Sequence, residues 1–235
     1  EDKVKRYDLS FLKMHDSDLL LRSERNSGEF IDLYASRVGI PFACNLNANS
    51  VTKAKAKALK VGKCVSVTLG IESGSERVRR EVLKKNVSNE SIAQAVANLK
   101  EVGIRVVSNN MIGIPDESEE EMRETLYLNR NVGVDLCETN YFYPFQGTEL
   151  GDLCYKRGYI KEVPKQLINF RFQYFLDMPQ ISKETLEGFR RTFQLYSRLP
   201  DWLDPIIKLA ERADKTGNEV FEALRGIVQK RINES

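Results

Sequence analysis

The chain has 235 residues, of which 41% are hydrophobic and 30% are charged, so it is long enough to bury the core of one large or two small domains. Its 36 Lys and Arg residues nearly balance 34 Asp and Glu residues, and the formal net charge of +2 excludes the global positive field typical of nucleic-acid-binding proteins. We therefore expect no nucleic-acid partner. No apolar run reaches the length of a membrane span, and the charged first six residues do not resemble a signal peptide. The sequence predicts a cytoplasmic protein.

The four cysteines are widely spaced and form no CxxC or CxxxCxxC cluster. They are Cys44, Cys64, Cys137 and Cys154. Strand-like or apolar sequence surrounds three of them, which favours buried and unreactive thiols. The single histidine cannot supply a site of several histidines, so we expect no metal ligands within the chain.

Apolar runs bounded by turn residues predict five β-strands along the first 150 residues. We expect these strands at residues 8–14, 42–46, 64–71, 104–112 and 134–142. Helical patterns follow them, and we expect helices at residues 28–38, 52–60, 75–84, 88–103 and 118–131. Thr52 is a predicted N-cap and Gly62 a predicted helix end, while Ser118 and Glu121 have the spacing of a capping box.

Repeated strand–helix units with short links require right-handed parallel crossovers, because no hairpin turn separates the strands. The fold class is therefore α/β, with either an open sheet or a full or partial (β/α) barrel. From about residue 148 the pattern is helical, with expected helices at residues 183–199, 201–213 and 216–232. We predict a barrel-like part at residues 1–150 and a helical C-terminal extension at residues 151–235.

Polar residues follow the central predicted strand directly. Glu72 ends the apolar run, and Ser73, Gly74 and Ser75 come next, before a helical pattern. A carboxylate at the mouth of a parallel sheet accepts hydrogen bonds from sugar hydroxyls, and a helix start attracts anions. The alternative interpretation is a helix cap with a solvated carboxylate, and spacing alone does not decide between the two.

Further polar residues have equally ambiguous positions. Asn109 and Asn110 interrupt an apolar strand, so one of them faces the interior and contacts either a ligand or an internal polar network. Asn45 and Asn47 end an earlier strand with the same ambiguity, and His15 with Asp16 either bind substrate or are structural. Lys84 ends a predicted helix, where it either neutralises a ligand carboxylate or is solvated.

Four segments together resemble the radical S-adenosylmethionine (SAM) enzymes, most of all the subgroup that often carries a cobalamin-binding domain. They are GIESGSERV at residues 70–78, LKKNVS at 83–88, NNMIGIPDES at 109–118 and FYPFQGTEL at 142–150. The segments occur in the order and at the spacing of the family over about residues 8 to 150.

The resemblance implies a partial (β/α) barrel and a set of SAM contacts. The position of Glu72, with Ser73 beside it, corresponds to a residue that binds the ribose, and Asn109 to one that often does so. Met111 corresponds to an apolar neighbour of the adenine and Lys84 to a basic partner of the methionyl carboxylate. Tyr143 begins the segment that contacts adenine, in many relatives through its backbone.

Two departures from the family matter. Asp116 stands where many relatives have glycine, and the CxxxCxxC loop that holds the [4Fe-4S] cluster is absent. We therefore expect a fragment of a longer enzyme, inactive by itself, whose full-length parent uses SAM and a [4Fe-4S] cluster, with cobalamin as a further candidate cofactor. The expected chemistry is reductive cleavage of SAM to a 5′-deoxyadenosyl radical, with no catalytic residue from this chain and with a small-molecule or unknown substrate.

Two other functions stay open at this point. One is an unrelated (β/α)-barrel enzyme that uses His15, Asp16 and Glu72 as acid–base groups. The other is a non-catalytic binding or scaffold domain. The missing first strand–helix unit leaves an unpaired sheet edge near residues 8–14, through which we expect self-association or pairing with another chain.

We predict that anaerobic reconstitution of this chain with iron and sulfide yields no stable [4Fe-4S] cluster, because scattered cysteines cannot supply clustered thiolates. Iron and sulfide analysis of the desalted protein checks this. Near-stoichiometric iron for one cubane, lost on replacement of Cys44 or Cys64, would contradict it.

Overall fold

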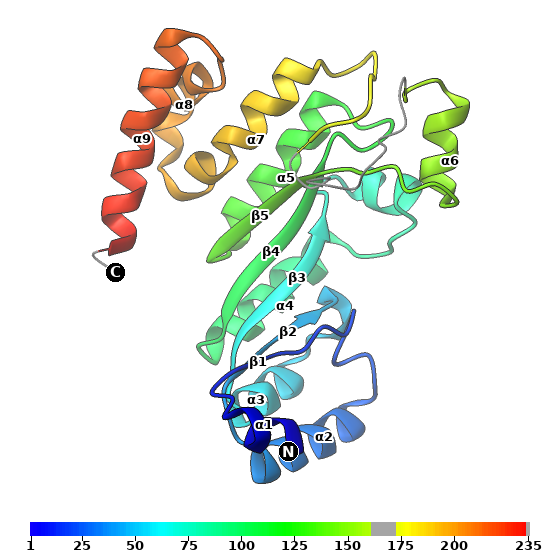
Figure 1. Cartoon of the computed structure of the whole chain (residues 1–235), viewed down its shortest axis with the longest axis vertical. Coiled ribbons are helices and arrows are strands. Elements are labelled where there is room, and N and C mark those ends of the chain that lie inside the picture. The colour runs from blue at the N-terminus through cyan, green and yellow to red at the C-terminus, as the bar shows by residue number, and fades with distance from the viewer. Residues whose placement is uncertain (161–172, 234–235) are drawn as a thin grey trace. The chain divides into compact units, whose positions relative to one another are not determined.

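The computed structural model describes residues 1–160 and 173–233, and its strands form one five-stranded sheet in the order β1-β2-β3-β4-β5 (Figure 1). The strands are β1 (Leu12–Lys13), β2 (Phe42–Leu46), β3 (Cys64–Glu72), β4 (Arg105–Ile112) and β5 (Leu136–Tyr141). The pairs β1–β2 and β2–β3 are parallel. Hydrogen bonds from Asp135 N to Val106 O and from Phe142 N to Ile112 O advance in the same direction, so β4 and β5 are also parallel. The predicted parallel α/β class is confirmed.

The chain divides into two compact units. The first comprises Glu1–Ile71, Val87–Asn109 and Val132–Glu138, and the second comprises Glu72–Asn86, Asn110–Asn131 and Thr139–Ser235. The strands β3, β4 and β5 therefore begin in the first unit, and their C-terminal ends belong to the second. The boundary near residue 150 that the sequence suggests stays a prediction.

The first unit buries apolar residues between its strands and helices. Its helical segments are α1 (Asp2–Tyr7), α2 (Glu24–Arg37), η1 (Ala48–Ser50), α3 (Lys53–Val61) and α4 (Asn89–Glu101), with α2 packed on α3 and α3 on α4. Thr52 caps α3 as predicted, because its hydroxyl accepts a hydrogen bond from Lys55 N at 3.2 Å. Gly62 follows α3 because a Cβ there would lie 2.6 Å from Cγ2 of the buried Ile31.

The second unit contains the helices that follow the strand ends. They are η2 (Val78–Val82), α5 (Glu119–Val132), α6 (Glu149–Lys156), α7 (Lys183–Arg198), η3 (Asp201–Leu203), α8 (Asp204–Ala210) and α9 (Lys215–Asn233). Figure 1 shows α7, α8 and α9 gathered together, and each of the three packs on the other two. Arg123 of α5 pairs with Glu211 at 3.3 Å, which ties α5 to this helical extension. The predicted C-terminal helices are confirmed.

Three predicted elements differ in extent. The strand expected at residues 8–14 is only Leu12–Lys13, because Asp8 takes a left-handed conformation at the end of α1, which turns the chain. The helix expected at residues 75–84 contains the wide η2 turn instead of a regular α-helix. The helix expected at residues 201–213 is split into η3 and α8, with Pro205 in the first turn of α8.

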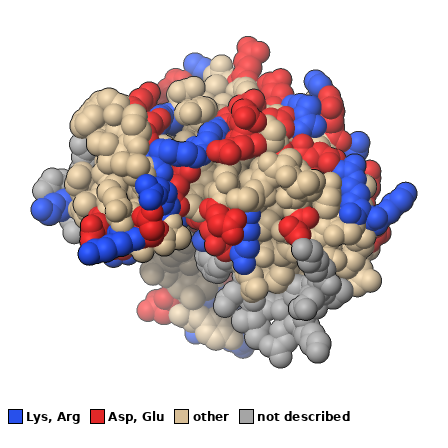
Figure 2. Space-filling model, turned by 90° about the horizontal axis from the view of Figure 1, so that it is seen from above, with Lys and Arg blue, Asp and Glu red and all other residues tan. Residues whose placement is uncertain are grey.

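The surface has mixed charge. On the face shown in Figure 2, the described acidic and basic side chains are intermixed with uncharged ones, and they do not separate into one basic and one acidic region. Among the helices in residues 1–160 and 173–233, none combines the length and apolar character needed to cross a membrane.

The close approach of the turn after β3 to α5 predicts that Gly74→Ala strongly destabilises the chain. A Cβ at Gly74 would lie 2.2 Å from the main-chain oxygen of Glu124. The main chain of α5 would have to move to remove this clash. We expect a loss of at least about 1–3 kcal/mol in the free energy of unfolding, measured by denaturant titration.

Gly28→Ala in α2 is the matched control, because nothing lies within 4 Å of a Cβ there. In a helix this change stabilises by about 0.5–1 kcal/mol. Equal effects of the two substitutions would contradict the assigned packing of Gly74.

Candidate functional site

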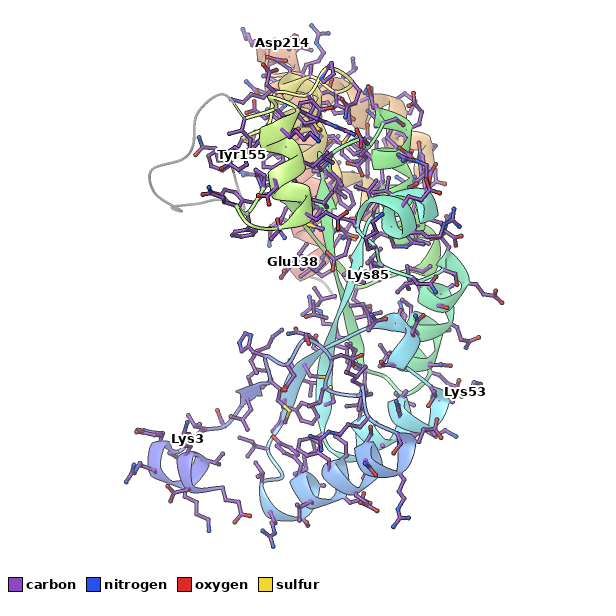
Figure 3. The ribbon with its side chains drawn as sticks, turned by 90° about the vertical axis from the view of Figure 1, so that its right-hand side faces the viewer. Lys3, Lys53, Lys85, Glu138, Tyr155 and Asp214 are labelled. Atoms are coloured by element: carbon purple, nitrogen blue, oxygen red, sulfur yellow. The ribbon has the colours of Figure 1, made fainter. Side chains whose placement is uncertain are left out.

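The turn after β3 places a carboxylate in an unusual backbone conformation. Glu72 is the last residue of β3 and has φ +69°, in the left-handed region that favours glycine. Its Oε1 lies 3.1 Å from Nζ of Lys85, which Figure 3 labels, and the two side chains are 21% and 24% exposed. Within residues 1–160 and 173–233 this is the one bond to the Glu72 carboxylate, so Oε2 can accept hydrogen bonds from a ligand.

The residues after Glu72 are held from several sides. The main-chain oxygen of Ser73 accepts a hydrogen bond from Arg79, and the amide of Gly74 donates to Thr125 Oγ1 at 2.7 Å. Ser73 is fully buried, and its hydroxyl accepts from the amide of Ser75 at 3.2 Å. The Ser73 side chain, predicted as a cofactor contact, thus makes an internal bond in this structure, and its predicted role stays untested.

Glu121 joins the turn after β3 to the turn after β4. Its Oε1 accepts from Ser75 Oγ at 3.1 Å and from Arg77 Nε at 2.6 Å, and Oε2 accepts from Arg77 Nη2 at 2.6 Å. The predicted capping box is confirmed, because Ser118 N donates to Glu121 Oε2 at 3.0 Å and Glu121 N donates to Ser118 Oγ at 3.2 Å. The hydrogen bond from Arg77 lowers the pKa of Glu121.

The two adjacent asparagines of β4 have different surroundings. Asn110 is fully buried, and its Oδ1 accepts from Nδ2 of the buried Asn129 at 2.9 Å, so it belongs to an internal polar network. Asn109 is half-buried and lies on the other face of the strand, together with Val107 and Met111. Asn109 and Glu72 belong to different units, so their joint contact with a ribose stays a prediction.

Lys84 has φ +52° and lines a cavity of about 370 Å³ in the second unit. The cavity carries charges of both signs and is lined by Glu81, Val82, Lys84, Asp116, Glu149, Leu150, Asp152, Leu153 and Lys156. The neighbouring Lys85, not Lys84, binds the Glu72 carboxylate. The role predicted for Lys84, contact with the methionyl carboxylate of SAM, stays a prediction.

The other predicted site residues lie in two places. Tyr143, in the second unit, is half-buried, with its ring 4.6 Å from that of Phe145 and 5.3 Å from that of Phe175. In the first unit, His15 and Asp16 are exposed after β1, and Nδ2 of Asn45 donates to Asp16 O at 3.2 Å. Asn47 caps η1 by accepting from Asn49 N at 3.0 Å. Asn45 and Asn47 therefore both bond to main-chain atoms of the chain itself.

A buried acid that the sequence pattern does not indicate lies in the turn after β4. Glu117 is fully buried, and its Oε2 accepts from the amides of Gly113 at 2.8 Å and Ile114 at 3.2 Å. Its Oε1 and the hydroxyl of Tyr174 are both buried without a hydrogen-bond partner among the described residues. Burial raises the pKa of Glu117 to about 8. Glu117 stands between Asp116 and the capping Ser118, just before three further glutamates, so the sequence gives no signal that this acid is the buried one.

The departure at Asp116 has a conformational explanation. Asp116 has φ +64°, which glycine adopts without strain, and this accounts for the glycine that many relatives of the resembled family have there. The carboxylate of Asp116 pairs with Arg157 of the segment after α6, and its main-chain oxygen accepts from Arg77 Nη2 at 2.8 Å. The turn therefore has the left-handed conformation that favours glycine, although the residue there is an aspartate.

These features define a parallel α/β protein in which polar and strained residues collect at the carboxyl ends of the strands, where this class places its sites. The model of the radical SAM superfamily matches residues 12–128, about half of the chain. The chain belongs to the radical SAM superfamily. Its fold is accordingly the predicted partial (β/α) barrel with parallel strands followed by C-terminal helices.

The chain is similar to several known proteins over part of their length. It is 26% identical over 144 residues to an uncharacterized methyltransferase of Pyrococcus horikoshii, covering 61% of this chain and 31% of that protein. The structure of the radical SAM methyltransferase TsrM from Kitasatospora setae has a TM-score of 0.56 at 13% identity, covering 66% of this chain and 30% of TsrM. The cobalamin-dependent SAM radical enzyme OxsB has a TM-score of 0.56 at 12% identity, covering 97% of this chain and 40% of OxsB.

The cysteines of this chain do not fit an iron–sulfur cluster. All four are buried and none forms a disulfide. Hydrogen bonding to Cys64 raises the pKa of Cys44, whereas Cys154 belongs to the other unit. Over residues 1–160 and 173–233, no three His, Cys, Asp or Glu side chains could together hold a metal ion. The adenosyl group of SAM fits better, because Glu72 presents a carboxylate oxygen for hydroxyl groups.

The buried Glu117 predicts a pH-dependent stability that Glu117→Gln removes. Its pKa of about 8 lies above the value of about 4.3 in an unfolded chain, so its contribution to stability is complete below pH 4 and falls as the pH rises toward 8. Each tenfold difference in proton affinity is about 1.4 kcal/mol, and we expect the wild-type chain to lose several kcal/mol relative to Glu117→Gln over this range.

Denaturant unfolding at a series of pH values from 5 to 9 tests this prediction. Glu120→Gln is the control, because Glu120 lies on the same helix start and is exposed. Its stability should follow the wild-type pH curve. A wild-type curve parallel to that of Glu117→Gln would show that Glu117 is ionised in the folded state.

Proposed function

We propose that this chain provides the adenosyl-binding part of a longer radical SAM enzyme, in which an iron–sulfur cluster reductively cleaves SAM to a 5′-deoxyadenosyl radical. The cluster would supply the electron for cleavage, and this chain would bind and orient the nucleoside. The chain spans only 31% of the P. horikoshii relative, which is consistent with a partner region for the cluster elsewhere in the full-length protein.

The observation that carries this proposal is the conformation of Glu72. A non-glycine residue with positive φ costs roughly 1–3 kcal/mol and persists where the surroundings impose it, often at functional sites. A carboxylate whose second oxygen accepts hydroxyl donors suits the vicinal diol of a ribose. We propose that Asn109 adds an amide contact to the ribose, and that Met111 and Tyr143 border the adenine. Lys84 is a candidate partner of the methionyl carboxylate of SAM, and Ser73 is a candidate contact of the cofactor beside Glu72.

Relatives support a methyl-transfer reaction and cobalamin as a further cofactor. The P. horikoshii relative is described as a methyltransferase, and TsrM is a methyltransferase with cobalamin and a [4Fe-4S] cluster bound. We propose that the full-length parent of this chain is a cobalamin-associated enzyme acting on a small molecule.

A non-catalytic binding domain is the second candidate. The separation of the four cysteines favours it, because the described residues cannot form a cluster. The full-length sequence distinguishes the two functions, since a CxxxCxxC loop ahead of residue 12 supports the radical enzyme.

We predict that Glu72→Gly in the full-length protein weakens SAM binding by about one to two powers of ten while leaving the melting temperature equal or higher. Glycine relieves the strain of φ +69° but removes the carboxylate, whereas Glu72→Ala removes the carboxylate and keeps the strain. Both variants should lose affinity in titration calorimetry, and Glu72→Ala should melt at the lower temperature.

Lys63→Gly is the matched control. Lys63 has φ +67° just before β3, so glycine relieves a similar strain at the other end of the same strand. SAM affinity should stay within about twofold of wild type. Unchanged affinity in both Glu72 variants would refute the assignment of the ribose contact.

A further inference from the structure

Arg79 is a charged residue in an unusual environment. Its side chain has an exposed fraction of 0%, although arginine is almost never fully buried unless it is paired. Its Nη1 donates to the main-chain oxygen of Ser73, and its Nη2 lies 3.9 Å from Glu76 Oε1. Burial lowers the pKa of Arg79, and the negative charges of Glu76 and Glu124 oppose this. Burial thus disfavours the charged form of this side chain, which nevertheless lies against the turn that follows Glu72.

The main chain of Arg79 makes a second connection. Lys85 N donates to Arg79 O at 2.7 Å, and Leu83 N donates to Val78 O at 2.9 Å, so η2 is wider than an α-helical turn. This width brings the amide of Lys85 onto Arg79. The Nζ of Lys85 then reaches Oε1 of Glu72 at 3.1 Å.

The peptide between Ser73 and Gly74 is held at both ends. Arg79 binds its carbonyl oxygen, and the buried Thr125 Oγ1 accepts from its N–H at 2.7 Å. A peptide plane fixed in this way restricts ψ of Ser73, so the chain directly after Glu72 has little freedom to relax the strained φ of Glu72.

We propose that Arg79 is a positioning residue for Glu72: its side chain fixes the Ser73–Gly74 peptide, one residue beyond Glu72, and its main chain fixes the lysine that orients the Glu72 carboxylate. The inference rests on the proposed role of Glu72 in binding the ribose of SAM. The carboxylate nearest to the Arg79 guanidinium, that of Glu76, is 49% exposed, so replacing Arg79 by Met leaves no buried charge at Glu76. Thermal melts beside the affinity measurement then separate positioning from folding.

The test is a double-mutant cycle in the full-length protein, with SAM affinity measured by titration calorimetry beside thermal melts. Arg79→Met should weaken binding about tenfold in the wild-type background and less than twofold in the Glu72→Ala background, because the carboxylate to be positioned is then absent. Arg80→Met is the control, since Arg80 lies on the same turn, 65% exposed, and pairs with Glu81. It should leave the affinity unchanged.

Each outcome has a distinct meaning. Unchanged affinity in Arg79→Met, or an equal loss in both backgrounds, overturns the positioning role while leaving the proposed function intact. Unchanged affinity in Glu72→Ala overturns the proposed function and this inference with it. If Arg79→Met does not fold, Arg79→Lys keeps the buried charge without the guanidinium fork, and a wild-type affinity in that variant overturns the inference.

Discussion

The carboxylate of Glu121 is the interaction on which the rest of the second unit depends. Its two oxygens accept hydrogen bonds from the amide of Ser118 just before α5, from the Ser75 hydroxyl and from the Nε and Nη2 atoms of Arg77. Bidentate charge-assisted bonds of this kind are among the strongest side-chain interactions and are also the most restrictive in geometry. Because Arg77 also binds the main-chain oxygen of Asp116, the turns after β3 and β4 are joined through one acid.

The architecture of the strand ends follows from this connection. Gly74 packs against the main chain of α5, and Thr125 of the same helix binds the Gly74 amide. Glu72 therefore enters its left-handed conformation in a turn whose neighbours are already fixed. Strain at one residue is tolerated where the surrounding contacts outweigh it, and here those contacts join residues 46 and 51 positions apart in the sequence.

Local sequence patterns predicted the strands, most helices and the capping box because these depend on neighbours within a few positions. Periodicity also showed that one of Asn109 and Asn110 must face the interior, but only the packing of Asn129 identified Asn110 as that residue. The ion pair between Lys85 and Glu72 could not be read from the sequence, because it depends on the wide turn of η2, which shifts the register of the chain by one residue relative to an α-helix. The burial of Arg79 and Glu117 could not be predicted either, because segments distant in the sequence cover them and the local sequence contains no sign of this.

The long-range origin of these contacts has a consequence for the order of folding. Ser75 and Glu121 are 46 positions apart, and Gly74 and Thr125 are 51 apart. Closing loops of this length costs entropy before any contact is gained. The helix α5 forms from local interactions, and β3 pairs with β2 across only 22 to 23 positions. The turn between Glu72 and Lys85 acquires its final shape only when α5 has docked. We expect amide protection in this turn to appear later during refolding than protection in β3, which makes the proposed ligand-binding segment one of the last parts of the chain to become native.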